Sequence, residues 1–382
     1  MNIKALDFNN FGTDIHTWFH PSVTLLHDGR LFAVMQTMKG SDHYGGPCFS
    51  ISADKGENWS APTEIPAFKN KRIDGTPFVE GVADIRPFTL QDGSVAVFGC
   101  TTFYTDNGAA AWDKQVEGKC PAQSAVYAIW SPETEKFGTR GILELPGIAS
   151  YRAACTQAIL DGDDRIVVPI YFNSGSICDY HDYKMPRFAS LTAVYRKQGD
   201  SLEYVAKSNS LELPILRGCI EPSIVRLHDG RYAMTLRAED GKMYRAIGDD
   251  TLSWHDMRPW QWDDGTTIKT ESTQQHWITL GQKAFLVYTR SNGENNGIMR
   301  FRAPLYIAEA DAERAMLFRS TEKIVFPRQC INGVEALYGN FHCAQLDDKR
   351  AIVSDSASFR FEREATIVMA ALVTDTEYTK LG

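Results

Sequence analysis

The sequence predicts an all-β chain folded as a six-bladed β-propeller. Three observations indicate this fold: a hairpin pattern that recurs six times, a spacing of 51 to 69 residues between successive hairpin turns, and the lack of a long amphipathic helical pattern. A repeat of this size has room for four strands and their loops, which is typical of a propeller blade. No linker-like stretch or abrupt change in composition divides the chain, so we expect residues 1–382 to form a single domain.

The clearest copy of the hairpin runs from Glu221 to Arg237 (EPSIVRLHDGRYAMTLR). Two apolar-rich runs flank the dipeptide Asp229-Gly230, and Asp-Gly tolerates the positive φ that a tight hairpin turn needs. Because a hairpin brings its two ends together, Glu221 and Arg237 are expected side by side at the end opposite the turn. An acid and a base held there form either a candidate site or a structural ion pair.

The other five copies share this hairpin pattern more than they share sequence identity. The first N-terminal segment, residues 3–8, is expected to add an outer strand to the last blade and so close the ring. The long polar and aromatic segment 173–187 is expected to be a loop over a ligand-binding face. The five copies span residues 22–37, 85–101, 156–172, 276–291 and 341–356.

Composition limits the classes of partner. The formal charge of −8, from 40 basic and 48 acidic side chains, argues against general nucleic-acid binding. No apolar run approaches the roughly 20 residues of a membrane span, and the N-terminus lacks the apolar core of a secretory signal. The eight cysteines show neither CxxC pairs nor zinc-site spacing. We therefore expect a cytoplasmic protein with reduced thiols (secreted if a leader was removed), without disulfide, metal or cofactor; the oligomeric state stays open.

Residues 52–59 form an S-x-D-x-G-x-x-W string. Ser52 and Asp54 are placed to bond the backbone of a turn, Gly56 to occupy its positive-φ corner, and Trp59 to cover it. We expect all four to be structural.

This string resembles the Asp-box of the sialidase (neuraminidase) superfamily, and segment 221–237 resembles the central segment of those enzymes. The resemblance covers residues 19–356 and implies a six-bladed propeller. It also implies that Arg237 and Arg302 belong to the arginine cluster that binds the sugar carboxylate, with Arg300 as a rival to Arg302.

The same resemblance also implies which residues carry out the reaction. Asp42 lies between the first hairpin and the S-x-D-x-G-x-x-W string, as the general acid of the family does. Tyr338 resembles the nucleophilic tyrosine, and Glu221 resembles its carboxylate partner. The pattern breaks at the start, where sialidases read Arg-Ile-Pro-Ser and this chain reads Phe-His-Pro-Ser from Phe19. Without that first arginine, whose place Phe19 or His20 takes, Arg86 or Arg290 would have to supply the missing cation.

These residue types suit an acidic sugar. Guanidinium groups bind carboxylates through two parallel hydrogen bonds. A sugar whose anomeric carbon bears a carboxylate repels an anionic nucleophile, whereas a tyrosine hydroxyl (pKa ~10) is neutral until a neighbouring carboxylate takes its proton. The resemblance therefore implies an exo-acting glycoside hydrolase that removes sialic acid or a related ulosonic acid from an acidic oligosaccharide or glycoconjugate, with retention.

Two other functions stay open. His20, His43 and His276, with an arginine, suit proton abstraction and elimination, or hydrolysis, in a glycan that contains uronic acid. A non-catalytic carbohydrate-binding propeller would use the arginines without a working acid. Each candidate also has a structural explanation, namely ion pairing for the arginines, core packing for Tyr338, a turn for Asp42 and backbone hydrogen bonding for His276.

Overall fold

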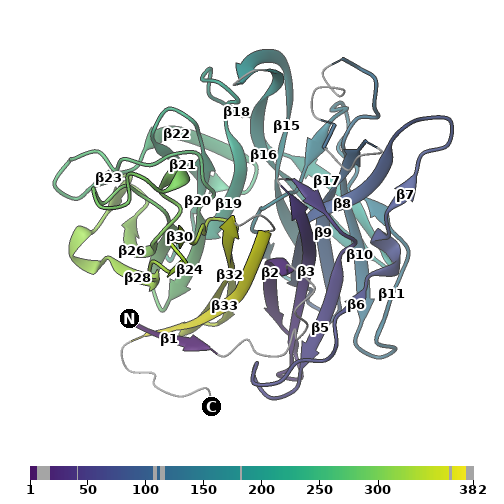
Figure 1. The fold of residues 1–382 in the computed structure, drawn as a ribbon, viewed down its shortest axis with the longest axis horizontal. Coiled ribbons are helices and arrows are strands. Elements are labelled where there is room, and N and C mark those ends of the chain that lie inside the picture. Colours follow the sequence, from purple (N-terminus) through teal and green to yellow (C-terminus); the bar gives the residue numbers. More distant parts are fainter. Residues whose placement is uncertain are drawn as a thin grey trace.

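Six small sheets, each built around an antiparallel hairpin, form the blades of a propeller (Figure 1), which confirms the predicted fold class. The structure is a computed structural model and describes residues 1–6, 18–40, 42–105, 110–111, 117–180, 183–360 and 364–375. Within these ranges no helix is long and apolar enough to cross a lipid bilayer. The helices described are three single 3-10 turns: η1 (Pro66–Phe68), η2 (Met299–Phe301) and η3 (Arg319–Thr321).

The first three blades each contain the hairpin that the repeats predicted, formed by β2–β3, β8–β9 and β14–β15. Blade one consists of β2 (Trp18–Leu25), β3 (Leu31–Gly40), β4 (His43–Tyr44), β5 (Cys48–Ser52) and β6 (Thr63–Glu64). Blade two consists of β7 (Lys71–Arg72), β8 (Val79–Thr89), β9 (Val95–Tyr104), β10 (Ala125–Ser131), β11 (Lys136–Phe137) and β12 (Gly141–Ile142). Blade three consists of β13 (Tyr151–Arg152), β14 (Ile159–Asp161), β15 (Arg165–Tyr180), β16 (Tyr183–Gln198), β17 (Ser201–Lys207) and β18 (Leu211–Glu212).

The last three blades repeat the plan with the hairpins β19–β20, β24–β25 and β31–β32. Blade four consists of β19 (Ile220–Arg226), β20 (Tyr232–Arg237), β21 (Met243–Asp250) and β22 (Ser253–Pro259). Blade five consists of β23 (Gln261–Trp262), β24 (His276–Leu280), β25 (Lys283–Tyr288), β26 (Leu305–Asp311), β27 (Met316–Leu317) and β28 (Lys323–Phe326). Blade six consists of β31 (His342–Asp347), β32 (Arg350–Arg360), β33 (Glu364–Thr374) and β1 (Asn2–Leu6), and a small ladder of β29 (Cys330–Ile331) and β30 (Val334–Glu335) precedes it.

The ring is closed by the two ends of the chain. The N-terminal strand β1 pairs antiparallel with β33, from Asn2 opposite Thr374 to Leu6 opposite Ala370, and is the outermost strand of blade six. Figure 1 shows the yellow strands β32 and β33 beside the purple strands β2 and β3 of blade one. The predicted closing strand is therefore confirmed over Ile3–Leu6, and residues 7 and 8 lie outside the described ranges.

Six buried apolar clusters fill the spaces between neighbouring blades, one cluster for each interface of the ring. Because successive side chains of a strand point to opposite faces, a single strand contributes to two of these clusters. In β9, Val95 and Val97 pack toward blade one, whereas Ala96 and Phe98 pack toward blade three. Both faces of each blade are thus covered, which explains why the inner strands read as nearly continuous apolar runs.

Residues 173–180 and 183–187 do not form the expected loop, and residues 181 and 182 lie outside the described ranges. Strands β15 and β16 continue as a paired ladder as far as Tyr180 opposite Tyr183, with a shift in register between Asn173 and Ile177. Polar residues in this segment had suggested a loop, but antiparallel pairing satisfies their backbone groups. The segment is an extended hairpin of blade three.

The S-x-D-x-G-x-x-W segment makes the expected contacts. The Ser52 hydroxyl accepts a hydrogen bond from the Gly56 amide at 2.8 Å, and Asp54 Oδ1 accepts one from the Asn58 amide at 2.8 Å. Trp59 is 8 % exposed and its Nε1 donates to the Gly56 carbonyl at 3.0 Å. Its ring belongs to the cluster between blades one and six, so this turn also supports the closure of the ring.

We expect Trp59→Ala to lower the free energy of unfolding by about 3–5 kcal/mol, because it leaves a cavity in the closing interface. Urea denaturation monitored by circular dichroism measures this loss. The control is Glu57→Ala in the same turn, which is exposed and should change the stability by about 0.5 kcal/mol or less. Equal effects of the two substitutions would contradict the role assigned to Trp59.

Candidate active site

A cavity of about 330 Å³ lies on the axis of the propeller, and residues of all six blades line it. Its walls are built near the starts of the inner strands, at the ends opposite the hairpin turns. Ligand sites in α/β and β architectures are typically such concave places where several chain segments converge. The cavity is therefore the candidate site.

At the start of four inner hairpins, one residue directs its side chain toward this region with the same backbone conformation. His20, Asp84, Cys155 and Glu221 occupy equivalent places in blades one to four, and all have a left-handed backbone with φ between 50° and 56°. In blades one, two and four the register of the inner hairpin shifts at this residue, as in a β-bulge. Bulges re-aim side chains and are common beside functional sites. The strain at four equivalent positions is consistent with a site there.

Glu221 and Arg237 meet on the cavity wall, as the hairpin predicted. Ile220 pairs with Arg237 in the ladder, and Arg237 Nη1 lies 2.5 Å from Glu221 Oε1. Arg237 Nε also donates to Ser272 Oγ at 2.8 Å. Burial alone would lower the pKa of Arg237, but the attraction of the Glu221 carboxylate outweighs it and raises the pKa. This arginine is a fixed cation.

Arg302 differs from Arg237 because no carboxylate of the described residues lies within ion-pair distance of it. It follows η2, and its Nε is buried without a hydrogen-bond partner. Burial and the positive charges of Arg237 and Arg300 lower the pKa of Arg302 to about 10, although the negative charges of Glu221 and Asp355 partly oppose them. Arg302 is therefore still charged at neutral pH, and it is a cation without an ion-pair partner on the cavity wall.

The cavity is strongly cationic although the chain as a whole is anionic. Of the arginines that line it, the sequence predicted only Arg237 and Arg302, with Arg300 as the rival of Arg302, as binding a sugar carboxylate. Arg152 lies with its Cζ 4.6 Å from the centre of the Phe188 ring, and Arg217 forms an ion pair with Glu239. Among the described residues six arginines and three carboxylates line the cavity: Arg152, Arg217, Arg237, Arg300, Arg302 and Arg360, with Asp42, Asp84 and Glu221.

Asp42 lies at the exposed edge of the cavity, with φ of 57°. The Tyr44 hydroxyl donates to Asp42 Oδ1 at 3.4 Å. Burial raises the pKa of Tyr44, and the negative charges of Asp42 and Asp84 raise it further. Tyr44 therefore stays protonated and acts as a donor that positions the Asp42 carboxyl.

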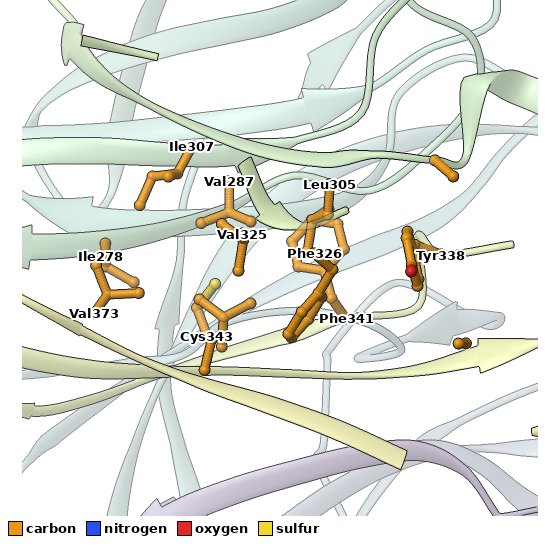
Figure 2. Close-up of a cluster of buried hydrophobic side chains, with 14 of the residues drawn as sticks. Ile278, Val287, Leu305, Ile307, Val325, Phe326, Tyr338, Phe341, Cys343 and Val373 are labelled. Atoms are coloured by element: carbon orange, nitrogen blue, oxygen red, sulfur yellow. The ribbon is translucent and has the colours of Figure 1, made fainter. Parts of the chain in front are cut away.

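Tyr338 is not on the cavity wall. It is fully buried in the cluster between blades five and six, where Figure 2 shows it at one end, near Phe326 and Phe341. Its hydroxyl donates to the Pro327 carbonyl at 2.6 Å, and burial raises its pKa. Glu221, its expected carboxylate partner, is bound to Arg237 instead. The expectation that Tyr338 presents its hydroxyl to a bound sugar is therefore not met, because packing holds the ring in the core.

Neither of the two arginines expected to replace the missing clamp residue lines the cavity. Arg290 pairs with Glu322 and stacks over the Tyr306 ring at 4.5 Å in blade five. Arg86 is 2 % exposed, donates to Ser22 Oγ at 2.9 Å, and lines a second cavity of about 580 Å³ nearer the hairpin turns. Strand β8 places Asp84 at the candidate site, whereas the side chain of Arg86 points in the opposite direction along the propeller axis.

The two candidate histidines are also buried outside the cavity wall. His20 is 1 % exposed, and its Nδ1 lies 3.1 Å from Asp84 Oδ1. His276 Nδ1 lies 2.7 Å from Ser223 Oγ on the propeller axis. Burial, helped by the charge of Arg86, lowers the pKa of His276 well below its usual value, so it is neutral. The third histidine considered, His43, does not line the cavity either.

Comparisons with known proteins agree with this architecture. No family model matches the chain, and no curated protein matches it. Among solved structures, a protein of unknown function from Dyadobacter fermentans is 14 % identical with a TM-score of 0.62, over 95 % of this chain and 96 % of that one. The intramolecular trans-sialidase from Ruminococcus gnavus is 13 % identical with a TM-score of 0.60, over 94 % of each chain.

A third similar structure is the Trypanosoma rangeli sialidase in complex with sialic acid. It is 13 % identical with a TM-score of 0.61, and the match covers 99 % of this chain and 59 % of that one. At such identities the likeness concerns the fold alone. The chain has a sialidase-like six-bladed propeller fold.

Proposed function

We propose that the chain is an exo-acting glycosidase that removes a terminal acidic sugar, sialic acid or a related ulosonic acid, from a glycan. The observation that carries the proposal is Arg302, a cation without an ion-pair partner beside the Glu221–Arg237 pair, in a cavity lined by six arginines. A ligand carboxylate would relieve the repulsion between Arg302 and its neighbours. The sialidase-like fold supports this class of ligand.

Arg302 and Arg237 bind the two oxygens of that carboxylate. Planar guanidinium groups suit this task, since each offers parallel N–H donors to a carboxylate. Arg152, Arg217, Arg300 and Arg360 raise the positive potential of the cavity, which attracts an anion despite the negative charge of the whole chain.

Asp42 protonates the oxygen that leaves, and its place at the cavity edge suits contact with the rest of the glycan. Glu221 receives the proton of the attacking group, because its Oε2 is buried on the cavity wall without a hydrogen-bond partner. The attacking group is a water molecule rather than Tyr338, whose hydroxyl is bound to Pro327.

The position of Tyr338 also favours a second candidate, a carbohydrate-binding propeller without catalytic activity. Elimination across a uronic acid has less support, since none of the three candidate histidines lines the cavity. Incubating the purified protein with a panel of acidic glycans, with products measured by mass spectrometry, separates the three. Products heavier by one water indicate hydrolysis, an unsaturated uronate absorbing in the near ultraviolet indicates a lyase, and binding without products indicates the second candidate.

Replacing Arg302 by methionine is expected to stabilise the fold and abolish anion binding. The pKa of Arg302 is lower in the folded chain than in the unfolded chain, so the charged guanidinium destabilises the fold. This destabilisation is fully present at pH 7, because Arg302 is charged in both states. We expect the free energy of unfolding to rise by on the order of 1–3 kcal/mol. Sulfate should raise the Tm of the wild type more than that of the variant.

Arg360→Met is the matched control, because Arg360 lines the same cavity but is exposed. It should leave the stability nearly unchanged. A loss of stability in Arg302→Met would contradict the destabilising effect assigned to this charge.

Arg237→Lys should weaken binding of the acidic sugar by roughly tenfold to a hundredfold, since a point charge does not reproduce the planar fork and a charged hydrogen bond contributes ~1.5–3 kcal/mol. Calorimetric titration with the sugar acid and with its methyl ester measures the effect. The wild type should prefer the acid. Equal affinity for acid and ester would exclude a carboxylate clamp.

Asp42→Asn should lower kcat by about 10²- to 10⁴-fold and leave binding intact, because the amide cannot protonate the leaving oxygen. Tyr338→Phe is the companion variant and should keep full turnover while losing about 1 kcal/mol of stability with its hydrogen bond to Pro327. Turnover on a natural acidic glycan reports both. Inactivity of Tyr338→Phe with native stability would restore the tyrosine as the nucleophile.

A further inference from the structure

Three of the residues with left-handed backbone form a compact cluster below the cavity. His20, Asp84 and Cys155 come from blades one, two and three, and one ligand atom of each lies within 4.8 Å of the others. In the part of the chain that the structure describes, no other group of His, Cys and acidic side chains is so close together.

Contacts within the cluster differ from those of an ordinary ion pair. His20 Nδ1 is 3.1 Å from Asp84 Oδ1, whereas His20 Nε2 is buried without a hydrogen-bond partner, and the residue is 1 % exposed. Buried polar atoms are nearly always hydrogen-bonded. In a tetrahedral zinc site, the ligand atoms lie about 2.0–2.3 Å from the ion and roughly 3–4 Å from one another, and no hydrogen bond joins them. The separation of His20 and Asp84 fits that geometry.

From this cluster we propose that His20, Asp84 and Cys155 bind a divalent zinc-type ion at the base of the cavity. An imidazole, a carboxylate and a thiolate form the borderline-soft donor set that zinc prefers over calcium or magnesium. The thiol of Cys155 loses its proton to solvent as the metal–sulfur bond forms, so the two anionic ligands balance the charge of the ion. The proposal goes beyond the glycosidase function and does not depend on it.

Surrounding groups hold the ligands in place. The Asp84 amide donates to Gln36 Oε1 at 3.0 Å, and Gln36 Nε2 donates to the Val82 carbonyl at 2.8 Å. The His20 ring packs against Phe19 at 4.2 Å between ring centres. These contacts hold the backbone of Asp84 and restrict the orientation of the His20 ring.

The site has three protein ligands, as catalytic rather than structural zinc sites do. Asp84 and Cys155 both line the cavity, whereas His20 lies behind them. The fourth coordination position therefore faces the cavity, where water or an oxygen atom of a bound sugar can occupy it.

Cobalt(II) is the probe, because it occupies zinc sites and a thiolate bound to it absorbs in the near ultraviolet. The full-length protein is stripped with a chelator and titrated with Co²⁺, and Zn²⁺ is then added to compete. We expect one equivalent to bind with a thiolate-to-cobalt band that zinc removes. Cys155→Ala should lose the band. It should also weaken cobalt binding by at least 10- to 100-fold, which is the loss caused by removing a residue that only contacts a metal ligand.

The matched control is Cys219→Ala, a buried thiol that donates to the Leu211 carbonyl between blades three and four. It should keep the wild-type spectrum. Asp84→Asn is the second ligand variant, for use if Cys155→Ala does not fold, and should keep the band but need at least tenfold more cobalt. Absence of the band in the wild type, its persistence in Cys155→Ala, or unchanged affinity in Asp84→Asn would overturn the metal site.

Discussion

Closure of the ring is the constraint on which the rest of the structure depends. Every blade is apolar on both faces, so it is covered only when it has a neighbour on each side. An open ring would expose one face of blade one and one face of blade six. The closing interface has eight buried apolar side chains, fewer than the twelve of the next smallest clusters. Trp59 is one of these eight side chains, and the pairing of β1 with β33 within blade six joins the two ends of the chain.

The cavity follows from that closure, because its charged residues come from separate blades and meet only in the complete ring. Bringing six arginines together costs electrostatic energy, which shows most clearly at Arg302. Neighbouring carboxylates relieve part of it at Arg237 and Arg217. Under the proposed function, the remaining repulsion is the energetic cost of holding a cation for a ligand carboxylate, a typical conflict between stability and function.

Much of the fold could be predicted from the sequence because its signals are local. A Gly or Asp-Gly turn between two apolar runs identifies a hairpin, and six such hairpins identify the blades. The Glu221–Arg237 contact was predictable for the same reason, since a single hairpin joins the two residues. The extension of β15 and β16 was not, because a polar surface hairpin and a polar loop have similar compositions.

The site was less predictable, because it depends on contacts between blades. Arg152 and Arg217 precede Cys155 and Glu221 by three and four residues, and because these spacings differ, the repeats gave no pattern that would have identified the two arginines. Tyr338 matched a family pattern, but whether its ring enters the core or the cavity depends on Phe326 and Phe341. The grouping of His20, Asp84 and Cys155 has no local spacing that a sequence pattern could detect.

The repeated left-handed residue separates the chemistry of this protein from its packing. His20, Asp84, Cys155 and Glu221 are four unlike side chains on one recurrent backbone conformation, and none of them belongs to the six clusters between the blades. Substitution at such a position in one blade therefore leaves the apolar contacts between the blades unchanged. In a propeller of this kind, a new specificity requires substitutions at only a few positions around the axis, while the blades and their interfaces stay the same.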